Sequence, residues 1–169
     1  MSDFKTQKAI KLTPEILAEQ VLDGEQRQNL LDLVGFLHTN GLKLKLAAKN
    51  AWEVVVRNPK NSLTWNQILR RLRVEPEHKI WSVSLHYFPE YTEYITGAEL
   101  INFVWDNLHS KNCHPNCANI KTRSFFGKEF DNMCCNEQIM ILNPSGKSLE
   151  YAKVLIMTAK KIVENGIAE

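Results

Sequence analysis

Apolar residues recur with the spacing of an α-helix in several stretches of the chain. The clearest stripe would bury one face of a helix, and it consists of Leu30, Leu33, Val34 and Leu37. Thr13 followed by Pro14 is typical of a helix start, because Thr can cap the first turn and Pro needs no N–H donor there. The pattern predicts helices over residues 14–22, 25–39, 97–108 and 148–165.

Elsewhere the apolar positions alternate, which is the pattern of a half-buried β-strand. Leu42, Leu44 and Leu46 alternate with lysines, and comparable alternation favours strands over 51–57, 79–88 and 137–142. No single period fits 63–74, where we favour a strand that ends at Val74. We therefore expect an α+β fold, with an antiparallel sheet of about four to five strands and helices packed on it.

The length of 169 residues suits one domain over residues 1–169, and residues 1–12 look like a loose N-terminal lead-in. The first 20 residues are polar and no apolar run reaches the roughly 20 residues of a membrane span. We expect a cytoplasmic protein with no membrane partner. Its four cysteines are then expected to be thiols, because the cytosol is reducing.

The net charge of +2 is too small to indicate a nucleic-acid partner by itself, but the charge is unevenly distributed. Residues 41–80 carry nine Lys and Arg against three Glu. The stretch combines arginines with tryptophans, and such a combination can bind single-stranded nucleic acid; they are Arg70, Arg71, Arg73, Trp52, Trp65 and Trp81. A nucleic-acid-binding module is the third function that we consider, and the modest charge ranks it last.

All four cysteines fall within residues 113–135, and this stretch is the main candidate site. Cys113 and Cys117 flank a proline turn, and the adjacent pair Cys134 and Cys135 follows after sixteen residues. The length of the segment between the two pairs suits a zinc site with these four cysteines as ligands. Adjacent cysteines seldom both reach one metal, however, and His114 would then be a substitute ligand. The alternatives are thiol chemistry, and cysteines that only pack as small apolar residues.

Two further stretches carry candidate chemistry. Lys147 and Ser148 lie between a strand and a helix, where N–H groups of the helix start could hold an anion. The stretch lacks the first glycine of a phosphate-binding loop, so we expect no nucleotide hydrolysis. In the aromatic loop 89–96, Glu90, Tyr91, Glu93 and Tyr94 could line a cleft for an organic ligand, with Trp81 or Tyr87 as its floor.

Residues 126–134, FGKEFDNMC, resemble a segment of an uncharacterised family of small bacterial proteins. In that family a cysteine-containing loop precedes the GKEFDN-x-Cys segment, and a short strand, an Asn-Pro turn and a final helix follow. Asn143-Pro144 and the residues after it are similar to that ending. The resemblance implies no activity, but it suggests that Cys117, residues 127–131 and Cys134 form one local unit.

These observations favour a cytoplasmic binding or accessory protein with residues 113–135 as its candidate site and a small molecule or a protein as its partner. The second hypothesis is a thiol- or metal-dependent enzyme that uses the same stretch. The third is the nucleic-acid-binding module formed by residues 41–80.

Overall fold

A computed structural model of the chain describes residues 3–57, 65–110, 120–133 and 137–165. The fold is α+β, as the sequence predicts, with a six-stranded antiparallel sheet in the order β1-β2-β3-β4-β8-β5 and a separate two-stranded ribbon, β6-β7. The strands are β1 (Leu44–Ala48), β2 (Ala51–Arg57), β3 (Trp65–Glu75), β4 (Ile80–His86), β5 (Leu108–Ser110), β6 (Lys121–Phe125), β7 (Lys128–Met133) and β8 (Glu137–Leu142).

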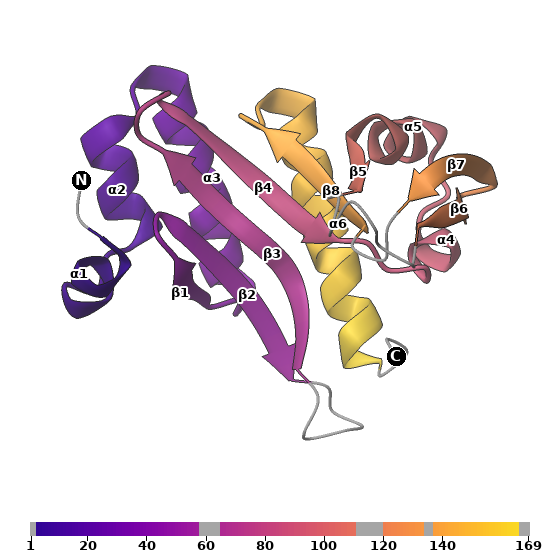
Figure 1. Cartoon of the computed structure of the whole chain (residues 1–169), viewed down its shortest axis with the longest axis horizontal. Coiled ribbons are helices and arrows are strands. Elements are labelled where there is room, and N and C mark those ends of the chain that lie inside the picture. The colour runs from indigo at the N-terminus through magenta and orange to yellow at the C-terminus, as the bar shows by residue number, and fades with distance from the viewer. Residues whose placement is uncertain (1–2, 58–64, 111–119, 134–136, 166–169) are drawn as a thin grey trace.

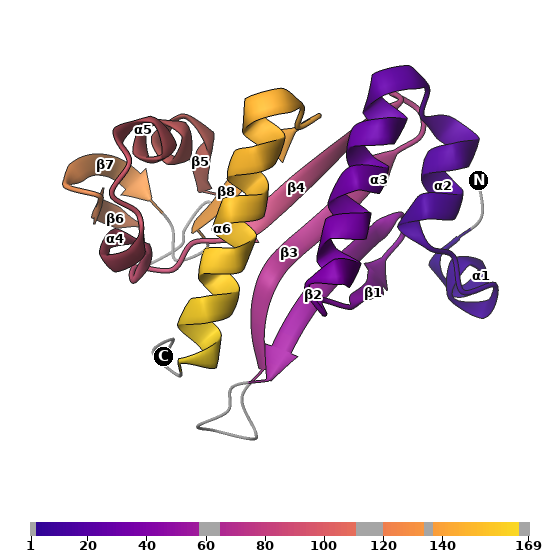
Figure 2. The same ribbon diagram turned by 180° about the vertical axis from the view of Figure 1, so that it is seen from behind.

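Six helices accompany these strands among the described residues. They are α1 (Phe4–Ala9), α2 (Pro14–Val21), α3 (Gly24–Thr39), α4 (Tyr91–Tyr94), α5 (Ala98–Asn107) and α6 (Gly146–Glu164). Helices α3 and α6 lie across one face of the sheet (Figures 1 and 2), with α2 beside α3 and the ribbon beside α4 and α5. None of the helices described covers the opposite face of β1 to β4, which faces the viewer in Figure 1.

Strand register explains why only one face carries the core. Leu72 pairs with Val83 and Val74 with Trp81, and all four side chains are buried under the helices. The residue between them, Arg73, points to the opposite face because side chains alternate along a strand. The buried face is continuous with the apolar stripes of α3 and α6, among them Leu33, Leu37, Leu155 and Ile156.

The N-terminal residues differ from the expectation of a loose lead-in, because residues 4–9 form helix α1. Asp3 caps this helix by accepting a hydrogen bond from the N–H of Thr6 at 2.8 Å. Gln7 is buried and exchanges two hydrogen bonds with Asn50 of the β1–β2 turn. A polar residue in a short polar segment gave no sequence signal of burial, since its partner lies 43 positions away.

The ribbon and β5 are strands that the sequence pattern did not predict, and they bring the total above the expected four to five. Phe125 pairs with Lys128, so Phe126 and Gly127 form a two-residue turn, and both have positive φ angles of 51° and 76°. Such turns fit the twist of a hairpin and favour glycine. Gly127 was a sequence signal of the turn, but β6 and β7 consist mostly of exposed polar residues and therefore lack the apolar–polar alternation that predicts a strand.

Candidate functional site

The cysteine stretch cannot be placed, because Cys113, Cys117, Cys134 and Cys135 lie outside the described residues, as does His114. Within the described ranges, no group of three or more His, Asp or Glu side chains is arranged to hold a metal ion. The zinc and thiol hypotheses therefore stay predictions from the sequence. In the sequence, Lys121 follows Cys117 by four positions and Glu137 follows Cys135 by two.

A direct measurement separates the cysteine hypotheses. If the four cysteines bind zinc, protein purified without chelator should contain about one zinc per chain, because a structural zinc site has about four ligands. If they are reactive thiols, the purified protein should contain no metal, and its cysteines should react with a thiol reagent in the native state. Four unreactive thiols without metal would contradict both hypotheses and leave the cysteines as packing residues.

Lys147 and Ser148, the candidate anion site, already have partners within the protein. The ammonium group of Lys147 lies 2.6 Å from a carboxylate oxygen of Glu99, which also accepts a hydrogen bond from the Tyr151 hydroxyl. Ser148 forms a capping box with Ser145, which satisfies the start of α6. An anion at this helix start would have to compete with Glu99, so the structure adds no support for the site.

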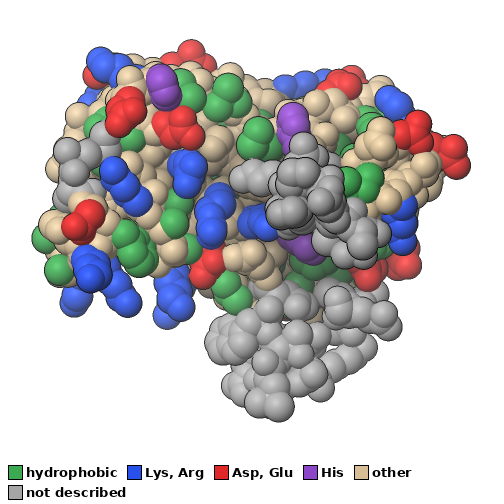
Figure 3. All heavy atoms as spheres, viewed as in Figure 1, with side chains coloured by type: hydrophobic (Ala, Val, Ile, Leu, Met, Phe, Trp, Pro, Cys, Tyr) green, Lys and Arg blue, Asp and Glu red, His purple; other side chains and the backbone are tan. Residues whose placement is uncertain are grey.

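Two of the tryptophans and two of the arginines of residues 41–80 lie on opposite faces of the sheet. Trp52 and Trp81 are buried under the helices, where their indole N–H groups donate to Leu12 O and Gln26 Oε1. Arg71 and Arg73 lie on the open face, and the side chain of Trp65 falls outside the described part. Figure 3 shows Lys and Arg side chains on the half of this face over β1 to β3.

Single-stranded nucleic acid needs basic and aromatic groups on the same surface. Arg71 and Arg73 also have carboxylate neighbours, since Glu53 lies 3.7 Å from Arg71 and Glu75 lies 4.0 Å from Arg73. Among the described side chains, Trp52 and Trp81 are thus separated from Arg71 and Arg73, which gives the nucleic-acid hypothesis no support, and it stays a prediction from the sequence.

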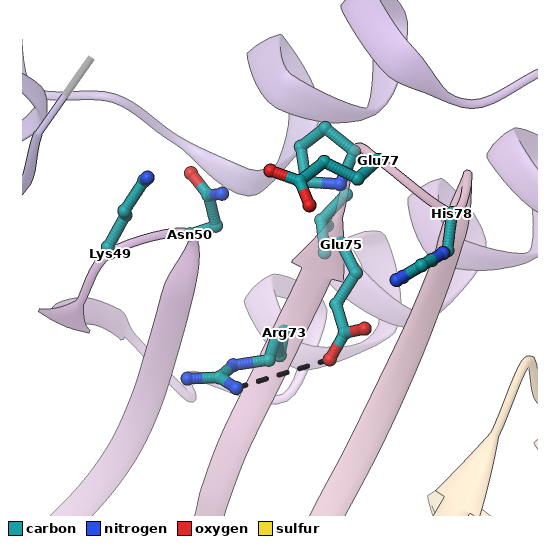
Figure 4. Close-up of a pocket in the computed structure, with 8 residues that line it drawn as sticks. Lys49, Asn50, Arg73, Glu75, Glu77 and His78 are labelled. Carbon is teal, nitrogen blue, oxygen red and sulfur yellow. Dashed lines mark ion pairs between the residues drawn. The ribbon is translucent and has the colours of Figure 1, made fainter. Parts of the chain in front are cut away.

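A small pocket at the β3–β4 hairpin also has balanced charges. It encloses about 260 Å³ between the β1–β2 turn and residues 73–78. Figure 4 shows Lys49, Arg73 and His78 around it together with Glu75 and Glu77, and the dashed line marks the Arg73–Glu75 pair. With opposite charges side by side, this pocket has no clear preference for an anion or a cation.

The largest pocket that we describe, which we call the ribbon pocket, lies between the end of β4, the start of α4, the ribbon strand β6 and the start of β8. It encloses about 490 Å³, within the range of roughly 300 to 1,000 Å³ typical of small-molecule sites. Its lining combines aromatic, hydroxyl and charged side chains, and it includes His86, Tyr87, Thr92, Lys121, Arg123, Phe125 and Glu137.

Arg123 and Glu137 form an ion pair that joins the ribbon to the sheet. Arg123 Nε lies 2.6 Å from Glu137 Oε1, although the two atoms lack the alignment of a hydrogen bond. The side chains are 27% and 12% exposed, so water screens the pair only in part. Glu137 thereby restricts the guanidinium group of Arg123 to the pocket, while other N–H donors of the fork are left for a ligand.

The aromatic wall of the ribbon pocket is formed by Tyr87 and Phe125, whose rings meet edge to face with centroids 4.6 Å apart. Burial, followed by the negative charges of Glu90 and Glu137, raises the pKa of Tyr87 to about 12. Its hydroxyl is therefore neutral near pH 7 and can donate a hydrogen bond. Phe125 is held in place because its carbonyl accepts a hydrogen bond from Trp105 Nε1 at 2.8 Å.

His86 supplies an uncharged imidazole at the border between the pocket and the open face. Burial, and to a lesser extent the positive charge of Arg70, lowers the pKa of His86 below its ordinary value, against the opposing effect of Glu137 and Glu90. Opposite it in the β4–β8 register lies Gln138, which is 1% exposed. Gln138 Oε1 accepts a hydrogen bond from Ser84, but its buried Nε2 has no acceptor among the described residues.

The ribbon pocket agrees in part with the organic-ligand cleft expected at the aromatic loop. Tyr87 lines it, as expected of the floor, and so do Pro89 and Thr92 of the loop, but none of the four loop residues expected to line the cleft is among its lining residues; these are Glu90, Tyr91, Glu93 and Tyr94. Tyr91 and Trp81 are instead core residues, and the Tyr91 hydroxyl donates to Leu155 O inside the protein. Sequence reasoning missed Arg123 and Glu137, because they come from two strands whose approach no local pattern reveals.

Comparison of the chain with protein families, with curated proteins and with solved structures finds no match. Within the described part of the chain, no helix combines the length and the apolar character needed to cross a membrane. The function must therefore be argued from the geometry of the sites themselves.

Proposed function

We propose that this protein is a binding protein that holds a small organic anion in the ribbon pocket. The observation that carries the proposal is the composition of the pocket wall. One cavity of about 490 Å³ brings the aromatic wall of Tyr87 and Phe125 together with the cationic groups of Lys121 and Arg123. Ligand sites are mostly apolar, with a few polar groups that set the orientation of the ligand.

The charges favour an anion over a cation. Lys121 has no carboxylate within ion-pair distance among the described residues, so its charge is available to a ligand. Arg123 is oriented by Glu137, and a guanidinium fork binds carboxylate and phosphate groups with two parallel hydrogen bonds. Glu137 is the only acidic residue of the lining, and the ion pair already engages it.

The remaining lining indicates what the anionic group would be attached to. The hydroxyls of Thr92 and Thr122 donate to Pro89 O and Asp131 Oδ1 and can accept from a ligand, whereas Ser124 can donate or accept. The edge of Tyr87 and the ring of Phe125 suit a planar apolar body, since aromatic rings pack well in edge-to-face geometry. The ligand class is thus a planar organic molecule with one carboxylate or phosphate.

The proposal can be tested with three simple probes: inorganic phosphate, benzoate and adenosine 5′-monophosphate. Titration of isotope-labelled protein with the two organic probes should shift the NMR signals of Tyr87, Phe125 and Arg123, and phosphate alone should bind more weakly because it lacks the planar body. Arg123→Gln should weaken binding roughly tenfold or more, because it removes a charge-assisted hydrogen bond.

The matched control is Arg73→Gln, which makes the same chemical change on the open face, outside the ribbon pocket. It should leave the affinity unchanged. Equal loss of binding in both variants would indicate a general charge effect. Shifts confined to residues outside the pocket, or none with any probe, would contradict the proposal.

A further inference from the structure

The outer edge of strand β1 is a second surface with unused binding capacity, independent of the ribbon pocket. Strand β1 is the first strand of the six-stranded sheet and pairs only with β2. In the described part of the chain, its backbone makes no hydrogen bond to α1, α2 or any element other than β2. The N–H and C=O groups along this edge are therefore available to another extended chain.

A groove runs beside this free edge, between β1, the α1–α2 connection and α3, and we call it the edge groove. It encloses about 340 Å³. Its floor is apolar and consists of Leu12, Pro14, Leu44, Leu46 and Trp52. An apolar groove next to an unpaired strand is the arrangement that recognition by strand addition uses, because backbone pairing supplies affinity and the pocket accepts alternate side chains.

The edge groove is held open by contacts inside the protein. Trp52 Nε1 donates to Leu12 O at 3.2 Å, which ties the α1–α2 connection to the sheet. Gln7 and Asn50 exchange two buried hydrogen bonds, which tie α1 to the β1–β2 turn. These bonds fix both walls, so a ligand would enter a preformed groove and would not have to order it.

The charge around the edge groove is one-sided. Lys8, Lys11 and Lys45 line it, are exposed, and have no carboxylate within ion-pair distance among the described residues. Glu15, the one acidic residue of the lining, lies 3.9 Å from His38. Two exposed lysines elsewhere have such partners, in the pairs Lys79–Asp23 and Lys147–Glu99, whereas Lys43, Lys121 and Lys128 are exposed without one among the described residues, so the feature particular to the edge groove is that three such lysines gather around one apolar floor.

We propose that the β1 edge binds, by strand addition, an extended segment of another protein in which acidic and apolar residues alternate. Alternation follows from the strand itself, since Leu44 and Leu46 share the buried face of the sheet with their partners Val54 and Trp52, whereas the side chain of Lys45, at the border of the groove, is directed to the open face. A chain paired with β1 would place its apolar side chains over the groove floor. Its acidic side chains would then lie opposite Lys45, and Lys8 and Lys11 would attract the remaining acidic residues.

Lysines on an edge strand also have a plain structural role, because they discourage pairing with other sheets. That role requires only that the edge repel apolar strands, and it gives no reason for a fixed apolar groove with lysines from α1 and from the α1–α2 connection. The two roles differ in what they predict for an acidic strand. Protection alone predicts no register-specific pairing, whereas the proposal predicts backbone pairing with β1.

The test uses a short fluorescent peptide that alternates glutamate with valine, measured by anisotropy against the full chain. Two further peptides carry N-methyl groups on alternate backbone nitrogens, one set on the even and one on the odd positions. Only one edge of the peptide can pair with β1, so one N-methylated peptide should lose binding and the other should retain it. A scrambled peptide of the same composition should bind at least several-fold more weakly.

Charge reversal at the edge groove provides the second part of the test. Lys45→Glu and Lys11→Glu should each weaken binding of the alternating peptide roughly tenfold, and added salt should weaken binding to the unaltered protein. Lys161→Glu on α6 changes the net charge equally, and it should have no effect because Lys161 lies outside the groove lining. Folding of each variant is checked by its thermal unfolding.

Several results would overturn the proposal. Equal binding of both N-methylated peptides would show that charge alone attracts the peptide, and no binding at low salt would leave the lysines as edge protection. A concentration-dependent dimer in sedimentation analysis, lost in Lys45→Glu, would identify a second copy of this chain as the occupant. Tighter binding of a single-stranded oligonucleotide than of the peptide would assign the lysines to nucleic acid.

Discussion

The two ends of the sheet differ in whether their cationic side chains have carboxylate partners. At the end formed by β8 and the edge strand β5, which we call the β8 end, the ribbon pocket holds Arg123 and Glu137 as a partly buried ion pair, so its main charges are already positioned by the protein. At the β1 end, Lys8, Lys11 and Lys45 surround an apolar groove without carboxylate partners in the described part. A cationic side chain that is oriented inside a pocket suits a small ligand, whereas cationic side chains without carboxylate partners along an open strand edge suit an extended partner.

The largest effect is expected from the residue on which the β1 end depends. Trp52 is 2% exposed and forms part of both the core and the floor of the edge groove. Trp52→Ala should lower the free energy of unfolding by about 3–5 kcal/mol, because it leaves a large cavity. Chemical denaturation measures this loss, and the edge groove should lose its peptide at the same time.

Trp52→Phe separates packing from hydrogen bonding at the same position. It keeps an aromatic ring but removes the donor to Leu12 O, so the expected cost is smaller, about 1–2 kcal/mol. If both variants were equally unstable, the hydrogen bond and not the packing would dominate. If neither lowered the stability, the β1 end would not depend on this residue.

The contrast between the two ends also shows how far the sequence could predict the fold. Helix α3 and strand β2 were predicted nearly to the residue, because Leu30, Leu33 and the residues after them have a clear period and turn residues mark their ends. Strand β3 was also correct, although its bulge at Leu69–Arg71 disturbs the alternation and made that stretch ambiguous. Strong local signals therefore gave the α+β class and most of the elements.

The sites depended on contacts between distant residues, and there the sequence was a weaker guide. Arg123 meets Glu137, and Gln7 meets Asn50, through pairings that no spacing in the chain announces. The tryptophans and arginines of residues 41–80 are close in the sequence, which suggested that they share one surface. Alternation along a strand instead puts neighbours in sequence on opposite faces of the sheet. Only the register of the sheet shows which side chains share a surface.

The next largest effect concerns the polar anchor of α1. Gln7→Ala should cost about 1–3 kcal/mol, because it leaves buried groups of Asn50 without the partners that the structure provides. A double-mutant cycle with Asn50→Ala measures the coupling between the two residues. Gln28→Ala, on the exposed side of α3, is the control and should be nearly neutral. Additive effects of Gln7→Ala and Asn50→Ala would contradict the anchor.

A smaller effect is expected from the ion pair at the β8 end. Glu137→Gln removes the charge that orients Arg123, and since the pair is partly exposed we expect a loss of about 1 kcal/mol. The larger consequence should be on binding, because an unrestrained Arg123 must be ordered by the ligand itself. Calorimetric titration with benzoate measures this cost. Unchanged affinity in a correctly folded Glu137→Gln variant would show that the pair has no orienting role.

The smallest effect is a dependence of stability on pH that His86 confers on the β8 end. Its folded pKa is lowered, chiefly by burial and then by Arg70, so the unfolded chain takes up a proton at a higher pH than the folded protein does. The contribution of His86 to stability is therefore complete above its unfolded pKa of about 6.5 and is lost as the pH falls below it. Between about pH 7.5 and pH 5, His86→Gln should reduce the slope of the unfolding free energy against pH.

The control for this slope is His78→Gln, because His78 is exposed in the β3–β4 hairpin and lies far from the ribbon pocket. Glu90, Glu137 and Arg70 remain in place in both variants, so their own titration is common to the comparison. A bound organic anion should oppose the effect, since negative charge beside His86 favours its protonated form. An identical slope in both variants would mean that burial of His86 contributes nothing to the pH dependence, and the two ends of the sheet would then differ in charge alone.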